Sequence, residues 1–302
     1  SLILKSGIYI MFNNITIFLC YILFIAKVII NSAAAGYNDM AKIIGAETYE
    51  TNFRRGEYFL LDNTANFLTN LTVFPLPDEK SKGVLVTPTS HGEILVGPTS
   101  YDSDTLTITT PEGLAEIKQK ALKTIKDIPF KQSIRNFSGV RVICGSDFIV
   151  EKSKLKNNVI NIAGICSPGL SSAPAIANYV ALNLLGLNNT EKKMKPRKPY
   201  TVVSELNKKQ INKLVSKNPD YGKIICKCEK VTLGEIKEAL NSPLKPKSVD
   251  AIKRRVYAGM GRCQGGFCLT RVISAIAKNY NISEMEVNKE NIGSNFYVEN
   301  IK

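Results

Sequence analysis

The sequence predicts an α+β protein in two parts: a mixed α/β domain with a largely antiparallel sheet, and a small helical domain that carries four cysteines. Three observations predict this fold class. Short apolar runs separated by glycine and proline fill residues 53–150, as in a sheet of short strands. Helical periodicity with capping signals dominates from residue 219 onward. Four of the seven cysteines lie within residues 226–268.

Composition places the chain among globular proteins. Its 302 residues are 44% hydrophobic and 22% charged, which is enough to bury a substantial core. The formal net charge of +14 raises the question of an anionic partner such as nucleic acid. The lysines are spread along the whole chain, without a base-reading motif or interleaved aromatic residues, so we expect no nucleic-acid partner.

The number and spacing of the cysteines argue against a secreted disulfide framework, because the number is odd and the spread uneven. Cys20, Cys144 and Cys166 stand alone in apolar surroundings, which is typical of buried core residues. The clustered four indicate a metal or redox site in a reducing compartment. We therefore expect a cytoplasmic protein, with peripheral attachment to the inner face of a membrane as the alternative.

Residues 8–30 are strongly apolar and have two interpretations. Asn13, Asn14, Thr16 and Lys27 interrupt the run, whereas a membrane helix needs about 20 predominantly apolar residues. The β-branched and aromatic content favours buried strands, with a hairpin turn at the two asparagines. The alternative is a membrane or export segment, because the "NSAAAG" that follows resembles a cleavage site.

The elements of the larger domain follow from local patterns. An apolar strand within 26–36 leads into a helix at 37–44 that ends at Gly45. Strands separated by glycine and proline are expected at 56–62, 71–77, 82–89 and 92–99, and the only histidine, His91, lies in an exposed turn. A Thr–Pro start predicts a surface helix at 109–125, before strand structure at 136–151 and a strand, glycine-rich turn and helix at 158–186.

The expected domain organisation follows from these elements. Residues 1–195 form the mixed domain, with its sheet at about 53–150 and flanking pieces at 26–47 and 157–187. Residues 196–218 are a linker with a short helix, 219–285 the cysteine domain and 286–302 a tail. Within the cysteine domain, Thr232 and Glu235 predict a capping box, and Ser248 predicts a second helix start.

The clustered cysteines have the spacing Cys226-x-Cys228, thirty-four residues, then Cys263-x4-Cys268. Single zinc ions are usually held by C-x2–4-C pairs, and a C-x-C pair fits that geometry poorly. Four thiolates without histidine suit a binuclear iron–sulfur cluster, in which each iron takes two cysteines. The surrounding glycines allow backbone amides to approach the sulfurs. A structural zinc site and a disulfide pair stay open as alternatives.

Two features of the larger domain carry chemistry. The turn "GICSPGLSSAP" at 164–174 opens a helix, so its free amides form an anion or carbonyl site, or else an ordinary strand-to-helix turn. Arg141 in "SGVRVICG" lies in an apolar strand, where an arginine needs a partner. That partner is either an internal carboxylate or an anionic ligand.

The cysteine segments "IICKCEKVTLGEI" and "KRRVYAGMGRCQGGFC" resemble the BFD-like [2Fe-2S] domain, the type of bacterioferritin-associated ferredoxin. Both halves have the spacing of that family. The resemblance implies that Cys226, Cys228, Cys263 and Cys268 are the ligands of a [2Fe-2S] cluster.

The stretches "RRGEYFLLD", "KGVLVTPT", "SGVRV" and "AGICSPGLSSAPAIA" resemble the FAD-dependent D-amino-acid-oxidase-type superfamily, over about residues 27–280. The most similar branch is that of glycerol-3-phosphate dehydrogenase and 2-hydroxyglutarate oxidase. The resemblance implies a substrate sheet beside an FAD-binding α/β domain. It implies that Arg141 holds the substrate's anionic group, with Arg55 as a weaker candidate. It also implies contacts with the flavin from Asn31, Gly36, Gly164, Ile165, Ser167, Pro168, Gly169, Leu170 and Ser171.

One element of that superfamily is missing from the expected place. The strand–GxGxxG–helix that binds FAD does not occur near residue 1, so the FAD-binding domain is expected to be incomplete and N-terminally truncated. The resemblance implies an FAD-dependent dehydrogenase that oxidises a small anionic hydroxy or amino substrate. Its electrons would pass through the cluster to a quinone or redox protein. The alternative is an electron-transfer subunit or fragment, inactive alone, whose flavin is held by a second flavoprotein subunit.

Overall fold

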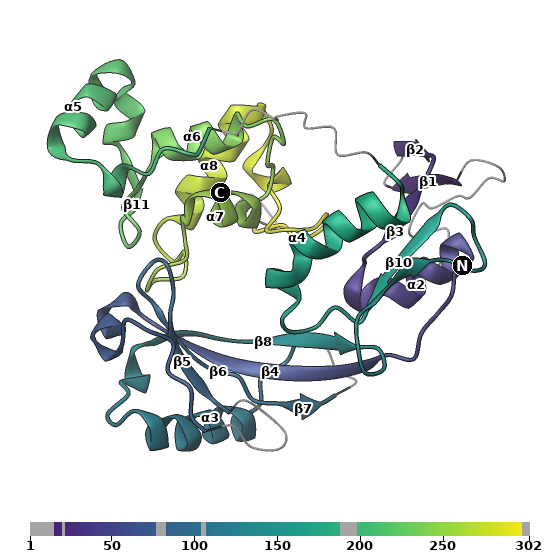
Figure 1. The fold of residues 1–302 in the computed structure, drawn as a ribbon. Coiled ribbons are helices and arrows are strands. Elements are labelled where there is room, and N and C mark those ends of the chain that lie inside the picture. The colour runs from purple at the N-terminus through teal and green to yellow at the C-terminus, as the bar shows by residue number, and fades with distance from the viewer. Residues whose placement is uncertain (1–14, 20–21, 77–82, 104–106, 188–197, 298–302) are drawn as a thin grey trace. The chain divides into compact units, whose positions relative to one another are not determined.

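The computed structural model describes residues 15–19, 22–76, 83–103, 107–187 and 198–297 (Figure 1). The chain forms two compact units, each with a core of its own. The first unit comprises residues 1–193 without two short segments, 62–64 and 132–134. The second comprises residues 194–302 together with those segments. Within the described ranges, no helix has the length and apolar character that crossing a membrane requires.

The largest sheet of the first unit has the strand order β5-β6-β4-β7, and β8 pairs with β4. β4 is antiparallel to β6 and β7, and β5 is antiparallel to β6, which confirms the largely antiparallel sheet that the sequence predicts. The bounds of its strands are β4 Asn52–Leu61, β5 Leu85–Pro88, β6 Ile94–Gly97, β7 Tyr101–Asp102 and β8 Ser133–Ile143.

Alternation along β4 gives this sheet one face that α3 covers and a second face without that helix, called the open face here. Phe59 and Leu61 point into an apolar cluster that also contains Ile117 of α3 (Pro111–Thr124). Successive side chains of a strand point to opposite faces, so Gly56 and Tyr58 belong to the other face. Helix α3 thus covers one face of the sheet and leaves the second face without this cover.

A buried carboxylate joins α3 to β4. The Glu57 side chain, fully buried on the α3 side, accepts hydrogen bonds from Thr110 N (2.8 Å) and Thr110 Oγ1 (3.0 Å). Thr110 in turn caps α3 by accepting from Gly113 N at 3.1 Å. A Cβ at Gly113 would lie 2.5 Å from the Glu57 carboxylate, so only glycine fits there. Glu57 also pairs with buried Arg55, with Nε 3.3 Å from Oε1.

A second, smaller sheet lies in the same unit. β3 (Ile29–Asn31) runs parallel to β10 (Val159–Ala163), and β10 pairs antiparallel with β9 (Ile149–Lys152). Helix α2 (Tyr37–Ile44) follows β3 and ends at Gly45 with φ of 71°, as the sequence predicts. Helix α4 (Gly169–Tyr179) follows β10. Tyr37 and Ala41 of α2 pack with the end of β8 and with β10 in one apolar core.

Two strand predictions require comment. The strand expected at 71–77 is wrong: of its described residues only Val73 forms a bridge, to Val86, since Pro75 offers no N–H for a ladder. Near the N-terminus, β1 (Ile15–Leu19) and β2 (Ile22–Ala26) form an antiparallel pair, so strands are present there. The turn expected at Asn13–Asn14 lies outside the described residues.

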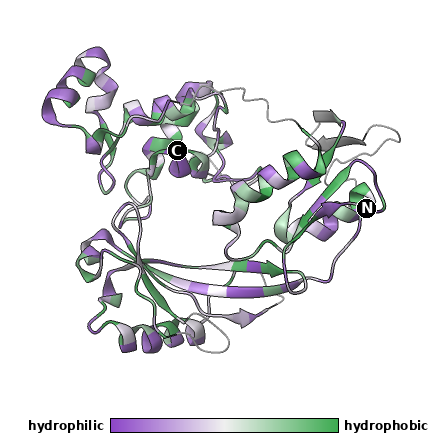
Figure 2. Cartoon of the chain, viewed as in Figure 1, coloured by the Kyte–Doolittle hydropathy of each residue, from purple (hydrophilic) through white to green (hydrophobic). Residues whose placement is uncertain are grey.

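The second unit is mainly helical, as predicted. Its core is built from α6, α7 and α8, around buried residues such as Ile236, Ile252 and Ile276. The predicted capping box at Thr232 and Glu235 and the cap at Ser248 are confirmed. α5 is mostly hydrophilic (Figure 2). The bounds are α5 Lys208–Lys217, β11 Ile224–Cys226, β12 Val231–Thr232, α6 Leu233–Leu240, α7 Val249–Val256 and α8 Leu269–Tyr280.

Replacing Glu57 with glutamine should lower the free energy of unfolding by about 3 kcal/mol, because buried Arg55 then lacks its counter-ion. Urea denaturation would measure the change. The matched control is Asp102→Asn, which removes the partner of Arg54 in an exposed pair of the same sheet. Exposed pairs contribute about 0.2–1 kcal/mol. Equal effects of the two substitutions would contradict the role given to Glu57.

Glu47 makes the small sheet sensitive to acid. Burial opposes ionisation of its carboxylate, but hydrogen bonds from Ser153, Asn161 and Lys154 N outweigh burial and hold the pKa at about 2. Because this pKa is lowered on folding, the stabilisation is present above the unfolded pKa of about 4.3 and is lost as the pH falls toward 2. Glu47→Gln should therefore flatten the dependence of stability on pH between about 4.5 and 2. Thermal unfolding across that range would test this, and an unchanged pH profile would refute it.

Candidate functional site

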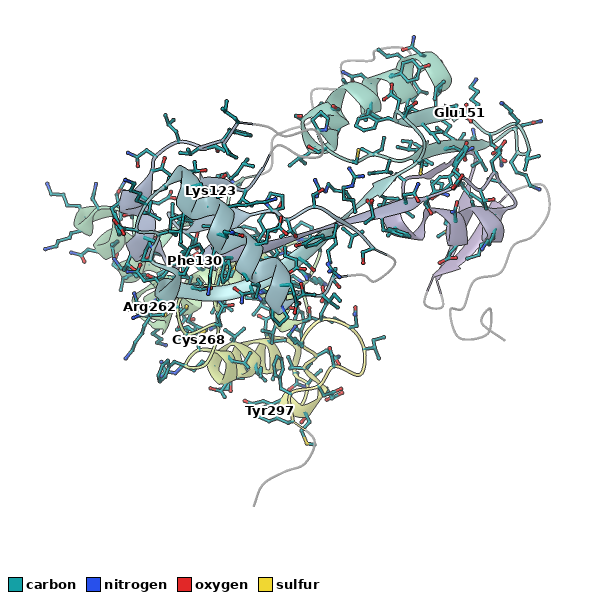
Figure 3. All side chains as sticks on the ribbon, turned by 90° about the horizontal axis from the view of Figure 1, so that it is seen from below. Lys123, Phe130, Glu151, Arg262, Cys268 and Tyr297 are labelled. Carbon is teal, nitrogen blue, oxygen red and sulfur yellow. The ribbon has the colours of Figure 1, made fainter. Side chains whose placement is uncertain are left out.

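The two cysteine motifs of the second unit are placed by short, tightly turned segments. Cys226 ends β11, and Cys228 follows in the turn that leads to β12, where Lys230 has φ of 54°. Cys263 lies in a series of turns after α7, and Cys268 immediately precedes α8 (Figure 3). Each motif therefore has one buried cysteine, Cys226 or Cys268, and one more accessible cysteine.

Glycine brings the two motifs together. A Cβ at Gly261 would lie 2.5 Å from Cys228 Cβ and 2.2 Å from a carboxylate oxygen of Glu229, so no larger residue fits. Gly259 and Gly265 have φ of 92° and 91°, a conformation that favours glycine. These residues allow the backbone after α7 to fold closely against the hairpin of β11 and β12.

The four cysteines interact as two pairs, and each pair takes one cysteine from each motif. Cys226 hydrogen-bonds Cys268, and Cys228 hydrogen-bonds Cys263. The bond from Cys268, helped by the amides of Gly259, Glu229 and Cys228, lowers the pKa of Cys226 to about 5. The same bond raises the pKa of Cys268. Burial opposes ionisation of Cys263, but amides of Phe267 and Gly265 lower its pKa.

This arrangement fits a binuclear cluster. Two irons that each need two thiolates match two pairs of sulfurs, and amides directed at thiolate sulfur stabilise negative charge. Within the described residues, no three His, Cys, Asp or Glu side chains converge on a site for one metal ion. Four thiolates without histidine, at C-x-C and C-x4-C spacing, suit a [2Fe-2S] cluster better than a single tetrahedral zinc ion.

Arg141 lies on the open face of the large sheet. Its Nη2 donates to Thr99 O at 3.4 Å and lies 3.4 Å from the position of a Cβ at Gly56. Burial raises the pKa of Tyr58, and the positive charge of nearby Arg141 opposes part of this rise. The Tyr58 ring stacks on Phe137, with centroids 5.1 Å apart. In the described part of the chain no carboxylate forms an ion pair with Arg141, so its charge is available to an anionic ligand.

Arg55 lies elsewhere. It is buried on the α3 side of β4, where its Nε faces Glu57, whereas Arg141 belongs to the side of Gly56 and Tyr58. The structure therefore does not bring the two predicted arginines together. The pair with Glu57 gives Arg55 a structural role.

The segments expected to contact flavin lie at one edge of the small sheet. β3 and β10 are parallel, with Asn31 opposite Asn161, so the chain leaves both strands on the same side. That edge therefore carries the residues after β3, up to Gly36, and the loop 164–168 with the start of α4. Carboxyl edges of parallel strands are where α/β sheets bind ligands. Buried Asn31 holds its turn by accepting from Ala33 N at 3.4 Å and donating to Tyr37 O at 3.1 Å.

The loop 164–168 is tightly constrained and touches the strand segment that follows Arg141. Gly164 has φ of 66°, and a Cβ there would lie 2.9 Å from the Cβ of Cys144, three residues beyond Arg141. A Cβ at Gly169 would lie 2.6 Å from Ile165 Cγ2. Pro168 precedes α4, and Leu170 is 93% exposed. The first amides of a helix lack intrahelical acceptors, so Leu170 and Ser171 present donors at this edge.

Sequence reasoning missed Tyr58, Phe137 and Glu57. The signal that could have found Tyr58 is the alternation "RRGEYF" in β4, which places it beside Gly56 on one face. Phe137 and Arg141 are four residues apart in β8 and share a face for the same reason. Glu57 needed the tertiary structure, because its main partner, Thr110, is 53 residues away.

The chain thus has two candidate sites, a sheet face beside the carboxyl edge of parallel strands and a cradle of four cysteines. Comparison with known proteins gives the family. The chain belongs to the FAD dependent oxidoreductase family, whose model matches residues 22–182. Residues 224–278 match the BFD-like [2Fe-2S] binding domain. The cofactors of these families, FAD and a [2Fe-2S] cluster, are those expected from the sequence.

Similar proteins act on glycerol phosphate. A glycerol 3-phosphate dehydrogenase of Caloramator mitchellensis is 41% identical over 275 residues, which cover 89% of this chain and 57% of that protein. The FAD-bound, dithionite-reduced L-alpha-glycerophosphate oxidase of Mycoplasma pneumoniae superposes with a TM-score of 0.57 at 26% identity, covering 65% of this chain and 54% of that one. A glycerol-3-phosphate dehydrogenase of Bacillus halodurans shares the fold, with a TM-score of 0.58 at 12% identity and coverage of 90% and 62%. The chain thus spans a little over half the length of its curated relative.

Replacing Cys263 with serine should abolish the visible absorption and the paramagnetic signal of the [2Fe-2S] cluster, because one iron loses a thiolate. Absorption spectra of the reconstituted protein, and electron paramagnetic resonance spectra of the same protein after reduction, would measure this. Cys166→Ser is the matched control, because Cys166 lies outside the four-cysteine cradle, and it should keep both signals. A complete cluster spectrum in the Cys263 variant would rule out this ligand.

Proposed function

We propose that this chain is part of an iron–sulfur flavoprotein dehydrogenase that oxidises glycerol 3-phosphate or a similar small anionic alcohol. The observation that carries the proposal is the half-buried Arg141, which faces the open side of the sheet without a carboxylate partner among the described residues. A cation in that position is stabilised by a bound anion. The relatives named above supply the choice of a phosphate ester.

In this proposal the chain's own residues bind and orient the substrate. Arg141 holds the phosphate, and Thr99 O fixes the direction of the guanidinium through its 3.4 Å hydrogen bond. The stacked rings of Tyr58 and Phe137 form a wall beside it and limit the access of water. When bound, FAD supplies an acceptor for the hydride of the substrate carbon, and the cluster supplies one-electron transfer.

The loop 164–168 and the start of α4 would lie toward the flavin ring. Their amides offer hydrogen bonds to developing negative charge, and the positive end of the helix dipole adds to this effect. Cys226, Cys228, Cys263 and Cys268 would hold the cluster. We expect the remaining FAD contacts from a strand–GxGxxG–helix, whether it belongs to the same protein or to a second flavoprotein subunit.

Anaerobic addition of glycerol 3-phosphate to the FAD-loaded protein tests the activity directly. Loss of the oxidised-flavin absorption with glycerol 3-phosphate, but not with glycerol, is the expected result. A purified chain with cluster absorption and no retained flavin would instead favour the electron-transfer subunit. Flavin binding without reduction by any phosphorylated or carboxylated alcohol would overturn the proposed substrate class.

Replacing Arg141 with alanine should raise the KM for glycerol 3-phosphate by about 10- to 100-fold, because a charge-assisted hydrogen-bonding partner of the phosphate is lost. Steady-state kinetics with an artificial electron acceptor would measure the change. Lys120→Ala on α3 is the control: it removes one cation from the covered side of the sheet, where Lys120 pairs with Glu116. An unchanged KM in the Arg141 variant would leave this residue with a structural role.

A further inference from the structure

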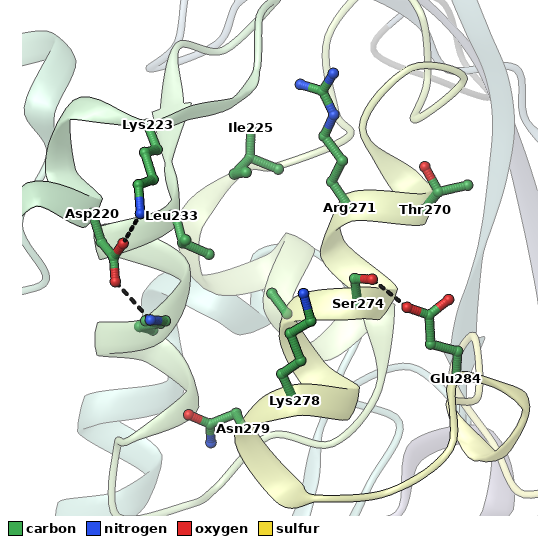
Figure 4. A pocket seen from close by; sticks show the side chains of 12 residues that line it. Asp220, Lys223, Ile225, Leu233, Thr270, Arg271, Ser274, Lys278, Asn279 and Glu284 are labelled. Carbon is green, nitrogen blue, oxygen red and sulfur yellow. Dashed lines mark hydrogen bonds and ion pairs between the residues drawn. The ribbon is translucent and has the colours of Figure 1, made fainter.

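A groove of about 780 Å³ lies on the cluster-bearing unit, between β11, α6 and α8 (Figure 4). No residue of the proposed substrate or flavin site contributes to it. Its rim is basic: Lys223, Lys237, Arg271 and Lys278 all line it. The volume is that of a ligand-sized cleft. The question is which kind of partner this surface would receive.

The acidic side chains of the groove already have partners within the protein. Asp220 binds two lysines, Lys223 at 2.9 Å and Lys237 at 2.6 Å. Glu284 accepts a hydrogen bond from Ser274. The two lysines offset the charge of Asp220, and with four cations against two carboxylates in its lining the groove has a net positive charge.

Arg271 and Lys278 carry the unneutralised charge. Both are exposed, and neither forms an ion pair with a carboxylate of the described chain. They lie seven residues apart on α8, which is two helical turns or about 10 Å along the axis. Figure 4 shows both side chains projecting from the same helix, with Ser274 between them. Two cations at this spacing match several separate carboxylates better than one small anion.

The middle of the groove is apolar. Ile225, Leu233 and Ala275 line it between the charged side chains. An apolar centre with a charged rim is the anatomy of a protein–protein interface. A quinone would gain from the apolar centre but would leave the cations without partners, so the rim favours a protein with acidic side chains.

The groove also adjoins the cysteine segments. Ile225 directly precedes Cys226, and strand alternation directs Ile225 to the groove and Cys226 to the interior. Thr270, which also lines the groove, is two residues beyond Cys268. A partner in the groove therefore lies against the backbone that holds Cys226 and Cys268.

We propose that this groove, defined by Ile225, Leu233, Arg271 and Lys278, is the docking site of an acidic redox protein. The inference rests on the proposed function, because a flavoprotein with a cluster needs an electron acceptor. Complementary charge speeds the encounter and orients the partner, and it is screened by salt. The partner would place carboxylates against Arg271 and Lys278 and an apolar residue against Ile225.

The test measures the Kd of the cofactor-loaded full chain for two probe proteins by calorimetry. One probe is a plant-type ferredoxin of net negative charge, and the other is cytochrome c of net positive charge. Measurements at 0.01 M and 0.15 M ionic strength cover Debye lengths of about 30 Å and 8 Å. The test variant is Arg271→Gln/Lys278→Gln. The control is Lys209→Gln/Lys213→Gln on α5, which removes the same charge away from the groove.

The proposal expects ferredoxin to bind and cytochrome c not to bind. The α8 variant should weaken ferredoxin binding about fivefold at low salt, and the α5 variant less than about twofold. Three results would overturn the proposal: no binding of ferredoxin, equal weakening by both variants, or binding of a short-chain quinone that depends on Arg271 and Lys278 while ferredoxin binding does not. Thermal unfolding would verify that both variants are folded. Flavin reduction by glycerol 3-phosphate needs no protein acceptor. That measurement therefore tests the proposed function independently of the docking site.

Discussion

The buried carboxylate of Glu57 is the interaction on which the larger unit depends. It lies on β4, receives both donors of Thr110 at the start of α3, and faces Arg55. By holding the start of α3 against one side of β4, the Glu57 carboxylate helps to determine which face of the sheet the helix covers. The opposite face keeps Gly56, Tyr58 and Arg141 free of this helix. A contact remote from Arg141 thus helps to keep the face that carries Arg141 free of this helix.

The cysteine cradle depends on a constraint of a different kind, the absence of side chains. Gly261 lets one motif approach Cys228 to a distance that no other residue allows, and Gly259 and Gly265 take left-handed conformations. As a result, backbone amides reach the sulfurs of Cys226 and Cys263. Glycine is used here for close packing around buried charge and not for flexibility.

Local signals in the sequence predicted the features that depend on neighbouring residues. Helix α2 with its end at Gly45 and the capping box at Thr232 are confirmed for this reason. The largely antiparallel sheet is also confirmed, and its signal was the series of short strands separated by glycine and proline. The prediction of a strand at 71–77 is wrong because it relied on the apolar content of this segment and gave too little weight to Pro75, which has no N–H for a ladder. The separation of Arg55 from Arg141 and the pairing of Cys226 with Cys268 depend on contacts between distant segments, which one sequence does not reveal. The assignments of ligands and substrate residues stay predictions.

The pairing of cysteines across the two motifs has a consequence for the stability of the protein in a cell. With the proposed ligands, each iron would join the hairpin of β11 and β12 to the segment before α8, closing a loop that contains α6 and α7. Metal that bridges distant segments contributes to folding free energy. The amount of this protein that survives proteolysis would then follow the supply of iron and sulfide. In a cell short of iron, the C-terminal unit would then be the part left without its metal cross-link.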